Sequence, residues 1–255
     1  MFLNFVFKGT KNPTHYIKVT GSKFIGIVNS PNFATSLNCM VFRLDNRIAF
    51  PDPHLGEPDG LIAIGGDLSA ERLLLAYCNG IFPWYSFKNE TIMWFCPMDR
   101  FVIFPEKVRI SHSMRNVLNK SIFTYTINKD FAEVIQNCST ANGRHELDGA
   151  WLGPDMIAAY QHLHNIGFAT SIEVWHDGQL AGGLYGVTIG HCFFGESMFS
   201  LEPNASKMAL IFLARLMAEK DGLFIDCQFE TEHLKSMGGE TISYDEYMAM
   251  LKADV

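Results

Sequence analysis

Three strand-like segments joined by two very short turns, between residues 169 and 199, constrain the fold of this chain most. The segments read ATSIEVW, QLAGGLYGVTI and CFFGESMF, and the turns between them read HDG and GH. Turns this short join antiparallel strands, because parallel strands need a crossover of a dozen or more residues. The region therefore predicts an antiparallel meander in which successive side chains point to opposite faces of a sheet.

Helical patterns lie on both sides of this meander. Apolar spacing and start and stop residues predict helices over residues 67–80, 154–166 and 204–222, and a last helix from about Asp245. The apolar stretch 223–228 reads as a further strand. Helix, meander, helix, strand, helix is an α+β order, with the helices packed on one sheet.

Length and composition predict two packed domains in a cytoplasmic protein. The 255 residues are 48% hydrophobic and 18% charged, and no stretch approaches the run of about 20 apolar residues that crosses a bilayer. Six scattered cysteines favour reduced thiols. The polar loop STANGRHELDG predicts a border, giving an N-terminal domain of residues 40–145 and a C-terminal domain of residues 146–255.

Charge limits the classes of partner. A formal net charge of -7 argues against a protein that coats nucleic acid by bulk electrostatics. A local basic strip could still bind phosphates, and the alternative is a solvated helix face. The strip comprises Lys107, Arg109, Arg115 and Lys120.

Polar residues in the predicted strands are the candidate functional groups. Asp226 and Gln228 are two apart, so they share a face of the strand, where Asp226 could accept a hydrogen bond from the Gln228 amide. The alternative is a polar pair that simply ends a strand. Glu173 raises the same choice between structure and function, because it lies between Ile172 and Val174.

The segment FFGESMFS adds a second group of candidates. Glu196 and Ser197 lie beside three phenylalanines, a composition that fits a small apolar pocket with a few polar groups or, alternatively, an aromatic core. Cys227 is predicted to point into the core, where a thiol is usually inert. No metal-ligand spacing and no phosphate-binding loop is present, so no cofactor is predicted.

Several blocks of the sequence resemble the leucyl/phenylalanyl-tRNA–protein transferase family. They are FPDPHLGEPDGLIAIGGDLSAERLLLAYCNGIFPWY, GAWLGPDMIAAYQHLHNIGFATSIEVW, GGLYGV, FFGESMFS, NASKMAL and IDCQ followed by HLKSMGG. The resemblance covers residue 40 to the C-terminus in order. Residues 1–39, which contain four lysines and no acidic residue, are an extension outside it, and Met40 is the predicted start.

The resemblance implies a small N-terminal α/β domain followed by a C-terminal domain with a GNAT-like, that is acetyltransferase-like, fold. It implies a bacterial cytoplasmic aminoacyltransferase that moves Leu or Phe, with Met as a further candidate, from aminoacyl-tRNA to proteins with N-terminal Arg or Lys. This transfer marks those proteins for degradation by the N-end rule pathway. No cofactor and no membrane is implied, and we expect a monomer.

Residue roles follow from the same resemblance. Asp226 and Gln228 match the catalytic pair, in which Asp orients Gln toward the attacking amine, and Glu173 matches an acid that meets the basic N-terminal residue. The aromatic residues that stack on the terminal adenosine match Trp84 and Trp151. The apolar aminoacyl pocket would be lined by Phe194, Met198 and Ile225 next to Glu196 and Ser197, and the basic strip would contact the acceptor stem.

Three alternatives stay open. An acyl-CoA N-acyltransferase of GNAT type would need a glycine-rich pyrophosphate loop, and SLEPNASK is not one. An enzyme that adds amino acids to peptidoglycan would share the donor but not the acceptor. A catalytically silent tRNA-binding protein is a third possibility, and an assay separates it from the enzyme.

Overall fold

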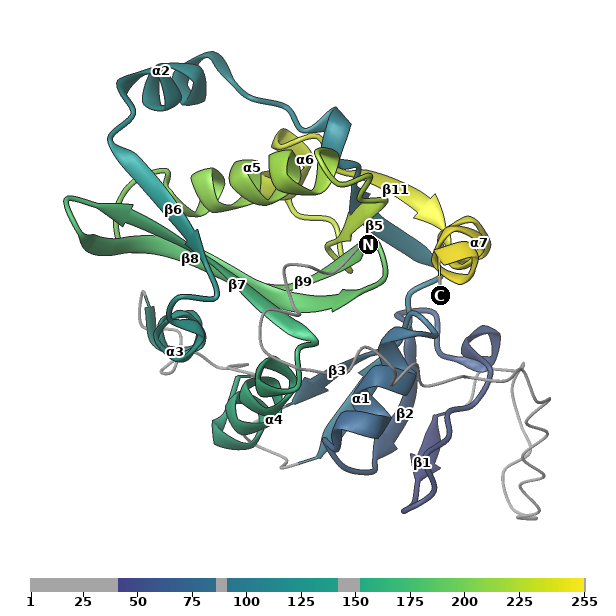
Figure 1. Ribbon diagram of the computed structural model, residues 1–255. Helices are drawn as coiled ribbons and strands as arrows, with labels where there is room; N and C mark the ends of the chain where they lie inside the picture. The colour runs from purple at the N-terminus through teal and green to yellow at the C-terminus, as the bar shows by residue number, and fades with distance from the viewer. Residues whose placement is uncertain (1–40, 86–90, 142–151, 255) are drawn as a thin grey trace, which may run out of the picture.

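The computed structural model describes residues 41–85, 91–141 and 152–254. Its elements form a small sheet and a large sheet with helices packed around both (Figure 1). The small sheet has the strand order β1-β2-β4-β3. These strands span Phe42–Leu44 (β1), Leu61–Gly65 (β2), Phe82–Tyr85 (β3) and Ile92–Phe95 (β4). Short 3-10 turns occupy Pro53–Leu55 and Pro105–Lys107.

The large sheet has seven strands in the order β11-β5-β10-β9-β8-β7-β6. Its bounds are Asp99–Ile103 (β5), Phe123–Ile127 (β6), Ala169–His176 (β7), Gln179–Ile189 (β8), Cys192–Ser200 (β9), Phe224–Asp226 (β10) and Glu240–Ser243 (β11). β7, β8 and β9 pair antiparallel, as the short turns predict. β10 is parallel to β9 and antiparallel to β5, so it joins the meander to the strand that follows the small sheet.

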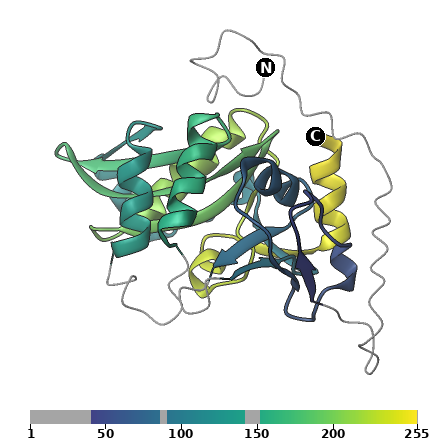
Figure 2. The same cartoon turned by 90° about the horizontal axis from the view of Figure 1, so that it is seen from below.

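The helices divide between the two faces of the large sheet. α5 (Ala205–Ala218) packs against β7, β8 and β9 on one face. α3 (Phe131–Thr140) and α4 (Pro154–Asn165) lie side by side on the other face, as Figure 2 shows. The remaining helices are α1 (Ala70–Tyr77), α2 (His112–Lys120), α6 (Glu232–Ser236) and α7 (Tyr244–Asp254).

Two buried clusters hold these layers together. One runs from the small sheet through α1 and α4 onto the large sheet, and includes Trp94, Tyr77, Tyr160 and Phe194. The other lies beneath α5 and includes residues such as Ile172. Because apolar burial stabilises by about 25 cal/mol per Å², the shared first cluster joins both sheets into one packed body.

The predicted α+β class and the order of elements around the meander are confirmed. Ser69 caps α1 by accepting a hydrogen bond from the Arg72 backbone N–H at 3.4 Å. One boundary was wrong: the strand predicted over 223–228 ends at Asp226, because Gln228 has a φ of 59° and leaves the extended conformation.

The border between domains stays a prediction. β6 precedes the predicted border at residues 145 and 146 and β7 follows it, yet both belong to the large sheet. β5 belongs to that sheet as well. We therefore propose that the smaller N-terminal part ends near Met98, where the chain passes from β4 to β5. Residues 1–39 lie outside the described part of the chain.

Candidate active site

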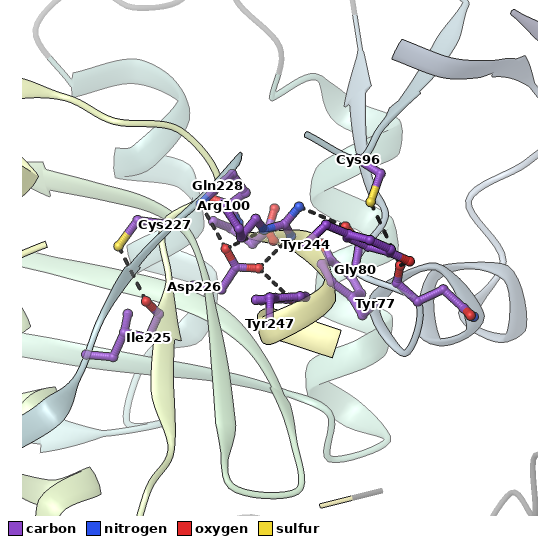
Figure 3. Close-up of polar contacts among 12 residues, drawn as sticks. Tyr77, Gly80, Cys96, Arg100, Ile225, Asp226, Cys227, Gln228, Tyr244 and Tyr247 are labelled. Carbon is purple, nitrogen blue, oxygen red and sulfur yellow. Dashed lines mark hydrogen bonds and ion pairs between the residues drawn. The ribbon is translucent and has the colours of Figure 1, made fainter. Parts of the chain in front are cut away.

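A buried ion pair lies at the C-terminal end of β10, where the chain leaves the large sheet (Figure 3). Asp226 and Arg100, on neighbouring strands, are both 0% exposed. Arg100 donates from Nε to Asp226 Oδ1 at 2.8 Å and from Nη2 to Oδ2 at 2.5 Å. The Tyr247 hydroxyl donates to the same Oδ2 at 2.9 Å. This paired geometry compensates charges that would be very costly to bury alone.

Arg100 also connects the large sheet to the small one. Its Nη1 donates at 2.8 Å to the carbonyl of Gly80, which follows α1. The rings of Phe82 and Tyr247 lie 4.9 and 4.8 Å from its guanidinium carbon. Burial lowers the pKa of Arg100, but the Asp226 carboxylate more than offsets this and the pKa is raised. Arg100 is therefore charged and held in place by these contacts.

Asp226 holds the turn that carries Gln228. The Gln228 backbone N–H donates to Asp226 Oδ1 at 2.9 Å, and the Gln228 carbonyl accepts from the Phe101 N–H at 3.3 Å. The predicted bond from the Gln228 side-chain amide to Asp226 is absent among the described residues, because the strand ends before Gln228. Asp226 thus positions Gln228 through the backbone rather than by sharing a strand face with it.

A β-bulge places Glu196 near this ion pair, where the charges of Asp226 and Arg100 act on its carboxyl group. We call the ion pair, Tyr247, Gln228, Glu196 and the two tyrosines that bind Glu196 the Asp226 cluster. Tyr185 pairs with Ser197 and Gly186 pairs with Gly195, so Glu196 has no partner of its own across the strands. Bulges of this kind redirect a side chain. Here the carboxylate turns toward α1 and α4, where Tyr77 donates to Oε1 at 2.7 Å and Tyr160 donates to Oε2 at 2.6 Å.

The environment makes Glu196 a titratable group near neutral pH. Burial raises the pKa of Glu196 to about 7, against the opposing effect of the two tyrosine hydrogen bonds. The Tyr77 and Tyr160 hydroxyls are also 2.6 Å apart. The two hydroxyls and the carboxylate thus form one compact hydrogen-bonded group.

Aromatic residues border this cluster. Trp84, on β3, is 38% exposed, and its ring lies 6.0 Å from that of Phe229, the residue after Gln228. Phe194 is fully buried, pairs with Asp226 across the strands and lies 5.1 Å from the Tyr77 ring. The structure therefore brings Trp84 and Phe194 to the Asp226 cluster.

Two predicted pocket residues lie on the opposite face of the sheet. Ile225 pairs with Phe193, while Asp226 pairs with Phe194, so Ile225 and Asp226 point to opposite faces. Ile225 and Met198 both pack in the cluster beneath α5. The structure does not group them with Phe194. Ser197, opposite Tyr185, follows Glu196 at the bulge.

Glu173 is also separate from the cluster. β8 and β9 lie between its strand and β10, a separation of about 14 Å at about 4.8 Å per strand. Glu173 is 0% exposed and accepts hydrogen bonds from the hydroxyls of Thr126 and Ser171, both at 2.5 Å. The backbone N–H groups of Lys129 and Asp130 donate to it at 3.2 and 3.4 Å. These contacts hold in place the backbone that directly precedes α3.

The basic strip lies on the side of the large sheet that is remote from the small sheet. Arg115 and Lys120 belong to α2, which Figure 1 shows well away from α1 and β2. Arg109, Arg115 and Lys120 are exposed, whereas Lys107 donates to Glu240 at 2.8 Å. Trp151 lies outside the described residues.

Sequence reasoning missed four residues of this cluster: Tyr77, Arg100, Tyr160 and Tyr247. The sequence does contain one indication for Arg100: a charged residue inside the apolar strand DRFVI must find a partner if it is buried. The indication for Tyr160 is weaker: it is a residue with a hydroxyl group on the apolar stripe of α4. Burial raises the pKa of the Cys227 thiol, and the low reactivity of that thiol stays a prediction. Within the described ranges, no group of residues is arranged to hold a metal ion.

Comparison with known proteins identifies the family. A family model described as leucyl/phenylalanyl-tRNA protein transferase matches residues 102–252, and the model of that family's N-terminal domain matches residues 66–98. The chain is 48% identical over 215 residues to the leucyl/phenylalanyl-tRNA–protein transferase of Syntrophobacter fumaroxidans, covering 84% of this chain and 91% of that protein. It is 49% identical over 209 residues to that of Flavobacterium psychrophilum, covering 82% and 98%.

A solved structure of a GCN5-related N-acetyltransferase from Kribbella flavida is similar with a TM-score of 0.36 and 10% identity, over 64% of this chain and 57% of that one. None of the helices in the described residues is long and apolar enough to span a membrane. The two family matches and the identity to both relatives lead to one conclusion. This chain belongs to the leucyl/phenylalanyl-tRNA–protein transferase family.

Proposed function

We propose that this chain is an aminoacyltransferase that moves Leu or Phe from aminoacyl-tRNA to the α-amino group of proteins with N-terminal Arg or Lys. The observation that carries the proposal is the Arg100–Asp226 pair, which fixes the Gln228 backbone at the end of β10 in a chain of this family. The enzyme would act in the cytoplasm as a monomer and mark its acceptors for N-end rule degradation. The identity to curated transferases supports this function over the acyl-CoA, peptidoglycan and silent-binder alternatives.

The chemistry asks mainly for positioning. The ester that joins the amino acid to the tRNA is already activated, so the enzyme has to align an amine with the ester carbonyl. An α-amino group has a pKa of about 7.7 to 8.0, so part of it is neutral near pH 7. The amine forms the new amide bond, the bond to the 3′ oxygen breaks, and the proton lost by the amine passes to water or to that leaving oxygen.

Asp226 serves this step as a positioning residue. It is buried and its oxygens already accept from Arg100, Tyr247 and the Gln228 N–H, which supports a role in holding the turn. The Gln228 amide is then the group that the turn offers to the attacking amine. An amide is a very weak base, so we assign it alignment of the amine and not removal of its proton.

Glu196 is the carboxylate that we assign to the cationic acceptor. It belongs to the Asp226 cluster and is partly exposed, whereas Glu173 is buried within its own hydrogen bonds. When ionised, Glu196 offers a charge-assisted hydrogen bond to Arg or Lys. This replaces the role predicted for Glu173.

The donor would bind on the aromatic side of the cluster. Trp84 is exposed beside Phe229, which supports stacking on the terminal adenosine, and such stacking contributes about 1–3 kcal/mol per base. Phe194 stays a candidate for the aminoacyl pocket, while the packing of Met198 and Ile225 under α5 supports a core role for them. Contacts of Trp151 with the adenosine and of the basic strip with the acceptor stem stay predictions.

The test uses purified protein, radiolabelled Leu-tRNA and three peptides that differ only in an N-terminal Arg, Lys or Ala. We expect label on the Arg and Lys peptides alone, and a large loss for Glu196→Gln with little loss for the matched variant Glu173→Gln once both are folded. Label on the Ala peptide as well would reject the acceptor assignment. Bound tRNA without any transfer would favour a silent tRNA-binding protein.

A further inference from the structure

An apolar hollow opens on the face of the large sheet that carries α5. It is about half open to solvent. Its apolar walls are formed by the second half of α5 and by the ends of three strands: Ile127, Ile172, Phe193, Leu213, Leu216 and Met217. The hollow reaches Gly222, before β10, whereas Asp226 ends that strand on the other face. It is therefore separate from the candidate active site.

A buried hydroxyl without a partner lines this hollow. Thr170 is 7% exposed, and its Oγ1 has no hydrogen-bond partner within the described residues. Thr170 shares a face of β7 with Ile172, two residues further on, so its side chain is on the α5 side. Buried polar atoms are satisfied in most proteins because leaving one unpaired costs folding free energy. A bound ligand with a hydrogen-bonding atom would satisfy it.

Lys220 supplies the other chemical feature of the hollow. It follows α5 and lines the same space, so a cationic side chain stands beside walls that are mostly apolar, with Thr170, Thr188 and His191 as the other polar residues. A long lysine stem can cover apolar surface while its ammonium group stays at the water boundary. This combination selects a ligand that has an apolar body and one negative charge.

We propose that the hollow binds a medium-chain alkyl carboxylate, with the chain between α5 and the sheet. Its carboxylate accepts hydrogen bonds from the Thr170 hydroxyl and from Lys220. Sites for small ligands commonly combine mostly apolar walls with a few placed polar groups in this way. The proposal concerns binding, and no bond in the ligand is made or broken.

The test is calorimetric titration of the full chain with decanoate and with uncharged decanol. We expect saturable binding of decanoate, weakened about fivefold to tenfold by Thr170→Val through the loss of one hydrogen bond. Lys220→Met should weaken decanoate binding and leave decanol binding unchanged. Arg215→Met, an exposed position on the same helix outside the hollow, is the matched control and should change neither. Leu216→Trp, which fills the hollow, should abolish both.

Two results would overturn the proposal. One is no saturable binding up to about 1 mM decanoate, which is no useful affinity for such a site. The other is equal binding in wild type, Thr170→Val and Leu216→Trp, since the ligand would then lie elsewhere. Thermal unfolding of each variant without ligand confirms that it folds. The titration contains no tRNA, so its outcome is independent of whether the proposed aminoacyl transfer is observed.

Discussion

At the scale of single residues, Glu173 and Glu196 show how two carboxylates in one sheet take different roles. Glu173 is buried and accepts four hydrogen bonds, two from hydroxyls and two from the backbone. We expect Glu173→Gln to lower the free energy of unfolding by about 2–4 kcal/mol, because a neutral amide replaces an acceptor of charge-assisted bonds. Urea denaturation measures this, with exposed Glu133→Gln as the control. A wild-type denaturation midpoint would contradict the structural role.

Glu196 predicts a pH dependence of stability. Its pKa is raised from 4.5 to about 7, so between these values the folded protein keeps a proton that the unfolded chain has lost. The free energy of unfolding should therefore fall as pH rises from 4.5 to 7, by at most about 3 kcal/mol from this residue. Denaturation at a series of pH values should show a shallower fall for Glu196→Gln. Parallel curves for the two proteins would refute the assignment.

At the scale of elements, α1 and α4 each supply a tyrosine that binds the Glu196 carboxylate at the bulge in β9. Tyr160 donates to Glu196 Oε2, and this bond lowers the pKa of that carboxyl. Tyr160→Phe should therefore raise the pKa of Glu196 further, by about one unit for the loss of a hydrogen bond to a charged group. The midpoint of the pH profile of KM for an Arg-peptide acceptor should rise with it.

Tyr185→Phe is the matched control for that experiment. The Tyr185 hydroxyl is buried and has no partner in the part of the chain that the structure describes, although its ring lies 5.4 Å from that of Tyr160. Its removal should leave the midpoint of the KM profile in place. Equal midpoints for Tyr160→Phe and Tyr185→Phe would show that the hydrogen bond does not tune Glu196.

At the scale of the whole molecule, one side chain links the two sheets through polar contacts. Arg100 binds Asp226 in the large sheet and the Gly80 carbonyl beside the small one. Arg100→Met should destabilise the protein by about 3–5 kcal/mol, because it leaves Asp226 buried without its counter-ion. Chemical denaturation measures the loss, and the double variant Arg100→Met/Asp226→Leu should recover much of it.

The double variant separates stability from function. Apolar replacements for a buried pair are often neutral for stability, but they cannot fix the Gln228 backbone as Asp226 does. We therefore expect a folded double variant with aminoacyl transfer reduced at least about a hundredfold, a loss within the range seen when positioning is disturbed. Wild-type turnover in that variant would exclude the positioning role of Asp226.

Local patterns in the sequence were sufficient for the elements and for part of the site. Short turns determined the antiparallel meander, and apolar spacing with capping residues determined α1, α4 and α5. The resemblance of the Asp226 and Gln228 segment to a family placed the candidate site at the end of β10. The residue at which that strand ends could not be predicted from the sequence, because Gln228 adopts a left-handed backbone conformation that the Asp226 side chain stabilises.

By itself, the sequence determined which residues form strands and helices and to which family the chain belongs, because those depend on periodicity and on matching motifs. Only the tertiary structure decided the partners of each polar group. Arg100 lies 126 residues from Asp226, and Tyr77 lies 119 residues from Glu196. The register of distant strands and the packing of α1 on the sheet bring these groups together, so Glu196 and not Glu173 joins the cluster. Local periodicity contains no information about such contacts.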